Sequence, residues 1–271
     1  MKQFENRVAV VTGAGSGIGR ATSLLLAQRG CKLALADVDE VGVNETKSQV
    51  HALGREASAH VVDVSDKARM QRFPAEVIEQ HGAVHILVNN AGVSVNGKFV
   101  DQSIEDFEWL IGINFWGVVY GCKFFLPHLL AAEEAHIVNI SSVFGLVGVP
   151  QQSSYCASKF AVRGFSESLR AELQDTQVGV SVVHPGGVAT QIVAKSRVTG
   201  DDELRRHHDK AIRAFKKMMP PARAAGYIVR GIEQNKPRVL IARETFVLDF
   251  AKRVAPNKSS ALIDWGMKRL H

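Results

Sequence analysis

Short apolar runs alternate along this chain with longer segments in which apolar positions recur every three or four residues. The runs are rich in Val, Ile and Leu and lack a strict in-and-out alternation, which is typical of strands covered on both faces of a sheet. They lie at residues 8–12, 32–36, 58–62, 85–89, 136–140, 179–183 and 238–242. Strands that alternate with helices predict βαβ units and a parallel sheet.

The longer segments have helical periodicity and often stop at a glycine, as near Gly30 and near Gly82. No internal repeat, low-complexity tract or linker rich in Pro, Gly and Ser divides the chain. We therefore expect one α/β domain over residues 1–271, with a doubly wound, mostly parallel seven-stranded sheet and helices on both of its faces.

Two segments depart from this alternation. Residues 191–221 are polar and charged and contain no strand candidate. A long excursion of this kind in a compact domain is usually a functional lid or a disordered loop, and we expect a lid over the substrate. Residues 244–271 hold two short amphipathic segments separated by Pro256, and we interpret them as a C-terminal extension.

The composition is that of an ordinary globular protein, and no uninterrupted apolar run approaches the roughly 18 residues of a membrane-spanning helix. The N-terminus shows no secretory signal. Cys31, Cys122 and Cys156 match neither a disulfide framework nor a metal-ligand spacing, and the histidines form no HExxH motif. We therefore expect a cytoplasmic protein that binds no metal.

The net charge of +6 is concentrated near the C-terminus, because residues 192–271 hold 18 Lys and Arg but only 8 Asp and Glu. These basic residues are interspersed with apolar ones and form no nucleic-acid-binding motif, so we expect no nucleic-acid partner. Three interpretations stay open: a solvated basic face, a site for an anionic handle on the substrate, and weak contact with a membrane surface.

The sequence VVTGAGSGIG, residues 10–19, places four glycines directly after the first apolar run. Glycine loses the most backbone freedom on ordering, so the cluster indicates a place where side chains must be absent. A glycine-rich turn between a strand and a helix lets the backbone approach a pyrophosphate. The spacing Gly13-x3-Gly17-x-Gly19 differs from the common GxGxxG, so the turn alone is weak evidence.

An acidic residue, Asp37, ends the second predicted strand, where its side chain can accept hydrogen bonds from the adenosine ribose hydroxyls. A 2′-phosphate would face a like charge there, at a cost on the order of 1–4 kcal/mol. Neither Ser16 nor Val38 offers a cation to offset that cost. We therefore predict NAD(H) as the cofactor, with NADP(H) as the alternative.

Tyr155 and Lys159 stand four residues apart in SSYCASKFAVRGF, and therefore on one face of a predicted helix. A phenol titrates at about pH 10 and is a poor base at neutrality, but a neighbouring ammonium favours the phenolate. A tyrosine tuned in this way can exchange a proton with the oxygen of an alcohol or ketone. A tyrosine and a lysine with this spacing also occur by chance, so the pair indicates a catalytic site only together with other motifs in the chain.

Further motifs occur in order around this pair: NNAG at residues 89–92, Asn114 in IGINFWG, Ser142 in IVNISS, and PGGVAT at 185–190. Together with the glycine turn and the tyrosine–lysine pair, they resemble the short-chain dehydrogenase/reductase family, in its branch of single-domain enzymes. The resemblance is dense over residues 5–190 and loose beyond them. It implies a Rossmann-type fold and oxidoreductase activity.

The resemblance also implies four catalytic roles. Tyr155 would be the general acid/base, and Lys159 would lower its pKa and bind the nicotinamide ribose. Ser142 would orient and polarise the substrate oxygen, although the adjacent Ser141 is a competing candidate. Asn114 would help to hold a water that links Lys159 to solvent, unless it only satisfies a neighbouring backbone group.

For the cofactor, the resemblance implies contacts of Asp63 and Val64 with the adenine, and of Val188 and Thr190 near the carboxamide. The full set of expected cofactor-binding residues is Gly13, Ser16, Gly17, Ile18, Gly19, Asp37, Asp63, Val64, Asn90, Ala91, Gly92, Tyr155, Lys159, Pro185, Gly186, Val188 and Thr190.

The expected reaction is reversible hydride transfer between the nicotinamide and the carbinol carbon of a secondary alcohol or ketone. The apolar residues within 143–150 favour a hydrophobic substrate. The alternatives are a protein that senses NAD(H) without turnover and an NADP(H)-dependent ketoreductase of the same family. The resemblance further suggests a homodimer or homotetramer built on helices around residues 103–131 and 154–174.

Overall fold

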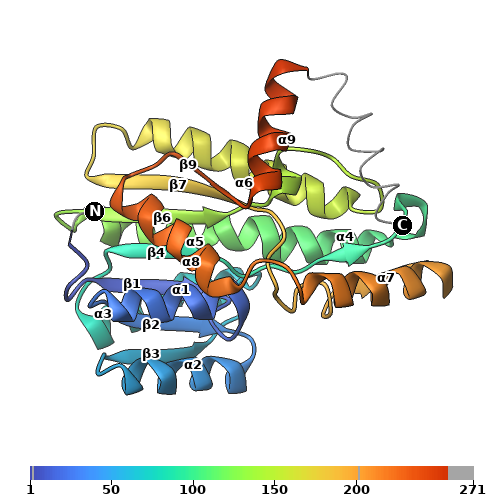
Figure 1. The fold of residues 1–271 in the computed structure, drawn as a ribbon. Coiled ribbons are helices and arrows are strands. Elements are labelled where there is room, and N and C mark those ends of the chain that lie inside the picture. Colours follow the sequence, from blue (N-terminus) through green and yellow to red (C-terminus); the bar gives the residue numbers. More distant parts are fainter. Residues whose placement is uncertain (2, 201, 256–271) are drawn as a thin grey trace.

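The computed structural model describes residues 1, 3–200 and 202–255, without the side chains of residues 202–205 and 207 (Figure 1). Its main sheet has the strand order β3-β2-β1-β4-β6-β7-β9, and every pairing in it is parallel. The strands are β1 (Val8–Thr12), β2 (Lys32–Asp37), β3 (Ala57–Val61), β4 (Ile86–Asn89), β6 (Ala135–Ile140), β7 (Val178–Pro185) and β9 (Arg238–Ile241). The predicted sheet is confirmed, and each strand begins and ends within about two residues of its expected bounds.

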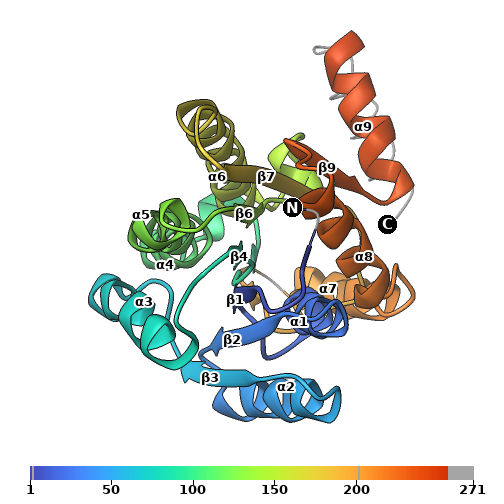
Figure 2. The same ribbon diagram turned by 90° about the vertical axis from the view of Figure 1, so that its left-hand side faces the viewer.

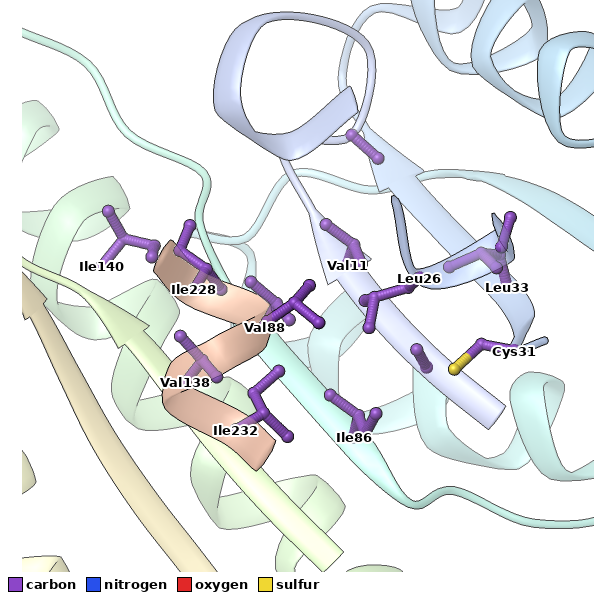
Figure 3. Packing of buried hydrophobic residues seen from close by; sticks show 14 of the residues in the cluster. Val11, Leu26, Cys31, Leu33, Ile86, Val88, Val138, Ile140, Ile228 and Ile232 are labelled. Atoms are coloured by element: carbon purple, nitrogen blue, oxygen red, sulfur yellow. The ribbon is translucent and has the colours of Figure 1, made fainter. Parts of the chain in front are cut away.

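Helices cover both faces of this sheet (Figure 2). One face carries α1 (Gly17–Gln28), α2 (Glu40–Ala52) and α8 (Pro221–Glu233), and the other carries α3 (Lys67–His81), α4 (Ile104–Ile111), α5 (Gly117–Leu130) and α6 (Ser153–Glu172). On the first face, Leu26 of α1 and Ile228 and Ile232 of α8 pack against apolar residues of β1, β4 and β6 (Figure 3). On the second, Phe73 and Phe125 meet edge to face with ring centroids 5.4 Å apart. Burial of these apolar faces holds the three layers together.

The chain passes from α4 to α5 through one wide turn of π type, η2 (Gly112–Trp116). By length and composition, the combined helical run Ile104–Leu130 could cross a membrane, because its most apolar window has a mean hydropathy of 1.3. Polar and charged residues interrupt this run, so it contains no continuous apolar stretch of that length. Its buried residues Phe125 and Leu129 belong to the core on the second face of the sheet. This part of the run therefore packs inside the protein.

The expected lid contains more structure than the sequence predicts. A two-residue strand, β8 (Arg197–Val198), pairs in parallel with β5 (Val95–Asn96), so the prediction that residues 191–221 contain no strand is wrong. A strand of this length is too short to show a hydrophobic periodicity. Helix α7 (Asp202–Phe215) follows in the same segment.

The C-terminal extension begins with α9 (Arg243–Val254), which projects from the body of the domain (Figure 1). It is the first of the two predicted amphipathic segments, and the second lies outside the described residues. The outer side of α9 carries exposed apolar side chains, namely those of Phe246, Val247, Phe250 and Val254.

The sheet topology places the functional residues. The chain runs outward from β1 through β2 to β3 and then crosses to β4 on the other side of β1, which is a reversal of strand order. In open parallel sheets, ligands bind outside the carboxyl ends of the strands at such a switch point. Thr12, Asp37 and Asn89 are the last residues of β1, β2 and β4. The predicted cofactor residues Gly13, Asp37 and Asn90 lie at these strand ends or directly after them, where this topology favours a ligand.

Candidate active site

The glycine loop, residues 12–19, runs from the last residue of β1 into α1, and its glycines stand where an added side chain would meet neighbouring atoms. Gly13 and Gly17 have φ angles of +64° and +54°, in the left-handed region that favours glycine. A Cβ on Gly19 would overlap the carbonyl oxygen of Gly13, and a Cβ on Gly13 would lie 2.8 Å from the Cα of Ala91. The loop is a cradle of bare backbone at the N-terminus of α1, which fits a pyrophosphate.

Thr12 fastens the glycine loop to the segment from Asn90 to Gly92. Its Oγ1 accepts hydrogen bonds from the N–H groups of Asn90 and Ala91 at 3.0 and 3.1 Å. The Asn90 side chain in turn donates to the carbonyl oxygens of Thr12 and Gly13 at 3.0 and 3.1 Å. Thr12 was missing from the predicted site residues, although its place immediately before the first glycine of the turn was an available signal.

Asp37 lies directly beside the glycine loop. Its Oδ2 accepts the N–H of Gly15 at 2.8 Å, and its Oδ1 accepts the N–H of Asp39 at 3.0 Å. A carboxylate oxygen has a second lone pair, so Asp37 retains capacity for a hydroxyl donor. The nearby Arg20 guanidinium already pairs with Glu45 at 2.7 Å. Asp37 therefore places a carboxylate beside the glycine loop at the end of β2.

A cavity of about 720 Å³ opens beside this loop. It is bounded by the glycine loop, the first turns of α1 and α2, the start of the lid, the C-terminal end of α7 and the start of α8. Of the predicted cofactor-binding residues, Ser16, Gly17 and Thr190 line this cavity, whereas Asp37, Tyr155 and Lys159 do not. The lining excludes the predicted adenine contacts Asp63 and Val64.

Three predicted cofactor residues make structural contacts in this chain. Ile18 packs against the core on the first face of the sheet, and Val64 belongs to the core on the second face. Asp63 accepts hydrogen bonds from the N–H and the Oγ of Ser65 at 2.9 and 2.7 Å. The roles of these residues toward a cofactor stay predictions.

Tyr155 and Lys159 lie one turn apart on α6, as their spacing predicts. The Nζ of Lys159 is 5.5 Å from the centre of the Tyr155 ring and donates to the carbonyl oxygen of Ile140 at 3.1 Å. Because Ile140 ends β6, this bond holds the ammonium at the carboxyl edge of the sheet. The tyrosine and lysine are thereby placed on the same edge as the glycine loop.

Burial acts on both groups of this pair. It raises the pKa of Tyr155 to about 12, an effect that hydrogen bonding with the Ser142 side chain opposes. It lowers the pKa of Lys159 to about 8, so the ammonium is still the main form at neutral pH. The net direction for the tyrosine pKa is opposite to the sequence-based expectation, because desolvation of the phenolate outweighs the favourable interactions around it.

The structure distinguishes the two adjacent serines. Ser142 caps the short helix η3 (Val143–Gly145), where its Oγ accepts the N–H of Phe144 at 3.1 Å and keeps its own proton free to donate. The Oγ of Ser141 instead donates to the carbonyl oxygen of Lys159 at 2.8 Å. Ser142 is therefore the serine with a proton available for an oxygen beside Tyr155.

A buried histidine that sequence reasoning missed supports Ser142. The Nδ1 of His184 lies 2.9 Å from the carbonyl oxygen of Ser142. Burial lowers the pKa of His184 to about 4, so the ring is neutral and donates through Nδ1–H. No local pattern signals this contact, because 42 residues separate its partners.

Asn114 lies in the wide turn η2 and is fully buried. Its Oδ1 accepts the N–H of Val93 at 2.8 Å, and its Nδ2 donates to the carbonyl of Val93 at 2.9 Å and to the Oγ of Ser158 at 3.2 Å. Ser158 in turn donates to the carbonyl of Tyr155 at 2.7 Å. The amide thus satisfies a neighbouring backbone, the alternative considered from sequence, and its water-holding role stays a prediction.

The loop that we expect on the nicotinamide side, residues 185–190 (the nicotinamide-side loop), begins at the last residue of β7. The N–H groups of Gly186, Ala189 and Thr190 donate to the carbonyl oxygens of Ile241, Met219 and Val188, at 2.9, 2.9 and 2.8 Å. The N–H of Val188 has no partner among the described residues. A free main-chain donor at this position fits the expected contact with a carboxamide oxygen.

The segment expected to form the lid is joined to α4 and to β5, which follows NNAG. The Arg197 guanidinium lies 3.6 Å from the centre of the Trp109 ring and 2.6 Å from the Oδ1 of Asp106, both on α4. A Cβ on Gly97 would overlap Thr199, so this glycine permits the close pairing of β5 with β8. The segment 93–97 and the lid, both expected to border the substrate, are joined in this way.

Within the described residues, no group of three or more His, Cys, Asp and Glu side chains could hold a metal ion. The donor chemistry of the site is instead that of hydroxyl, ammonium, carboxylate and main-chain groups, which suits a dinucleotide.

Residues 7–200 match the family described as short chain dehydrogenase. SadH of Mycobacterium tuberculosis, which is named as an oxidoreductase, is 40% identical over 271 residues that cover 99% of this chain and 98% of that protein. A cyclohexanol dehydrogenase from an Acinetobacter species is 34% identical over 194 residues, which cover 71% of this chain and 77% of the relative.

Two solved structures show the same fold with different cofactors. A short chain dehydrogenase/reductase from Burkholderia phymatum in complex with NAD is 33% identical, with a TM-score of 0.88 over 93% of this chain and 95% of its own. A metagenomic short-chain oxidoreductase in complex with NADP is 28% identical, with a TM-score of 0.72 over 88% of this chain and 97% of its own.

Proposed function

Because this chain belongs to the short-chain dehydrogenase family, we propose that it is an NAD(H)-dependent oxidoreductase that interconverts a secondary alcohol and a ketone. The observation that supports this most is the convergence of Tyr155, Lys159 and Ser142 on the sheet edge that also holds the glycine loop. A nicotinamide bound there would supply or accept the hydride.

The residues of this chain provide proton transfer and polarisation. Tyr155 takes the proton of the alcohol in oxidation and returns it to the carbonyl oxygen in reduction. Ser142 donates its free hydroxyl proton to the same oxygen and stabilises the negative charge that develops on it. The Lys159 ammonium, fixed by the Ile140 carbonyl, favours the phenolate form of Tyr155 and binds the nicotinamide ribose.

A hydrophobic substrate fits the surroundings of Tyr155. The ring of Phe144 packs edge to face against it at 6.1 Å between centroids. Val143, Leu146 and Val147 form a small apolar cluster in the same segment, and Leu248 of α9 packs against it. Cyclohexanol, which the name of one relative specifies, is a hydrophobic secondary alcohol.

A screen of NADH formation over alcohols grouped by polarity and chain length tests the proposed function. We expect turnover with cyclic or long-chain secondary alcohols, and values of kcat/KM that fall as hydroxyl groups are added, since apolar walls cannot pair them. NAD(H) binding without turnover of any alcohol or ketone would instead indicate a sensor.

We expect NAD to have a lower KM than NADP. The Asp37 carboxylate would repel a 2′-phosphate by about 1–4 kcal/mol, which corresponds to a preference of roughly 5- to 1000-fold. Michaelis constants for both cofactors with one alcohol measure this preference. Asp37→Ser provides the control, because it removes the charge and should narrow the gap; a lower KM for NADP in the wild-type protein would contradict the assignment.

The pH dependence of alcohol oxidation should follow the tyrosine. Because the pKa of Tyr155 is about 12, the phenolate fraction is small at neutrality, and kcat/KM should rise by nearly tenfold per pH unit between about pH 6 and 8. The rise should flatten above about pH 8, where Lys159 loses its charge. A flat or falling profile between pH 6 and 8 would show that another group is the base.

The family typically forms oligomers, and a homodimer or homotetramer is our proposal for this chain. Trp116 and Phe160, on the two helical segments expected to mediate assembly, are 46% and 41% exposed and offer apolar contact area. Membrane-surface contact through the basic C-terminal third and a cytoplasmic location stay predictions.

A further inference from the structure

The nicotinamide-side loop has one main-chain donor that is held by a side chain. The N–H of Gly187 donates to the Oε1 of Glu244 at 3.0 Å, whereas the paired N–H groups of Gly186, Ala189 and Thr190 donate to carbonyl oxygens. Building on the proposed function, we propose that Glu244 is a positioning residue, which fixes this loop so that the free N–H of Val188 meets the nicotinamide carboxamide.

The junction between β9 and α9 presents Glu244 to the loop. Ala242, which lies between the two elements, has φ +77° and ψ +149°, a conformation that non-glycine residues rarely adopt. Thr245 is fully buried, and its N–H and Oγ1 donate to the carbonyl oxygens of Ala242 and Ile241 at 3.2 and 2.8 Å. The strained turn is thus held in place, and it aims the first turn of α9 at the loop.

The loop is tightly enclosed on both sides at this point. A Cβ on Gly186 would lie 2.5 Å from the Oε1 of Glu244 and 2.8 Å from the Oγ1 of Thr245. A Cβ on Gly187 would overlap the Sδ of Met218. The loop therefore lies between α9 and the segment before α8, and the carboxylate is the one charged acceptor in its described hydrogen bonds.

Because the acceptor is a side chain outside the loop, it can be removed without changing the loop's own sequence. Glu244→Ala leaves the Gly187 N–H unpaired, whereas Glu244→Gln keeps an oxygen at the same place and removes only the charge. Glu79 is a matched control, because it is also an exposed glutamate on a helix but lies on α3, which packs on the opposite face of the sheet from α8.

The experiment combines NADH titration, followed by fluorescence, with amide hydrogen exchange of residues 185–190 in the full-length protein. We expect Glu244→Ala to weaken NADH binding by about 3- to 10-fold and to speed exchange of the Gly187 amide. Glu244→Gln should stay within about twofold of wild type in affinity, and Glu79→Ala should change neither measurement.

Unchanged exchange and unchanged NADH affinity in Glu244→Ala would overturn the proposal, as would an equal loss in Glu244→Gln and Glu244→Ala. Failure of the proposed function is recognised separately, since the wild-type protein itself would then bind no NADH. In that case the exchange measurement still decides whether Glu244 holds the loop, and a null result there also refutes its positioning role.

Discussion

Tyr155→Phe is expected to lower kcat for alcohol oxidation by about 10²- to 10⁴-fold, the usual contribution of a general acid or base. The substitution removes the hydroxyl that we propose as the general acid/base and keeps the ring that packs against Phe144. Steady-state kinetics at saturating NAD, together with NADH titration, measure the effect. The affinity for NADH should change by less than about threefold, because Lys159 and the glycine loop remain.

Two companion variants make this result specific. Ser142→Ala should also lower kcat, by a smaller factor, since it removes a donor to the same oxygen but not the base. Ser141→Ala should affect stability more than catalysis, because its hydroxyl is bonded to the Lys159 carbonyl. Turnover by Tyr155→Phe close to that of the wild type would refute the assigned role.

Gly19→Ala is expected to weaken dinucleotide binding by about 5- to 150-fold, since overpacking of a close contact typically costs about 1–3 kcal/mol. The added Cβ would overlap the Gly13 carbonyl and come within 2.6 Å of the Asn90 Nδ2. Both neighbours are bonded to one another, so the glycine loop and the Asn90 segment must move together. Isothermal titration calorimetry with NADH gives the dissociation constant directly.

Gly164→Ala is the matched control, because Gly164 is also helical and a Cβ there would meet no atom within 4 Å. It should leave binding unchanged and raise stability by about 0.5–1 kcal/mol through the better helix propensity of alanine. Equal affinities of the Gly19→Ala and wild-type proteins would show that the loop is not the pyrophosphate cradle.

The sequence predicts those parts of the fold that depend on local pattern. The seven strands show as apolar runs because they are covered on both faces, and the end of α3 shows because Gly82 adopts a positive φ of +78°. The spacing of Tyr155 and Lys159 likewise fixes their places on one helix. For these features a few neighbouring residues carry the whole signal.

Other features depend on contacts between distant segments and have no local pattern. The bond of Thr12 to the NNAG segment spans 78 residues, and that of Glu244 to Gly187 spans 57. The pairing of β5 with β8 joins two residues on each side and was missed for the same reason. The sequence-based prediction of a lowered Tyr155 pKa was also wrong in direction, because the spacing of two residues does not show how deeply they are buried.

The contact of Arg197 with Trp109 provides an intrinsic fluorescence probe of the segment that carries Arg197. A guanidinium 3.6 Å from an indole changes the electric field at the excited ring, so separation of the two groups alters the emission of Trp109. If the segment that carries Arg197 moves away from α4, the emission of Trp109 reports that movement. Rapid-mixing fluorescence then follows the movement during turnover without any attached dye.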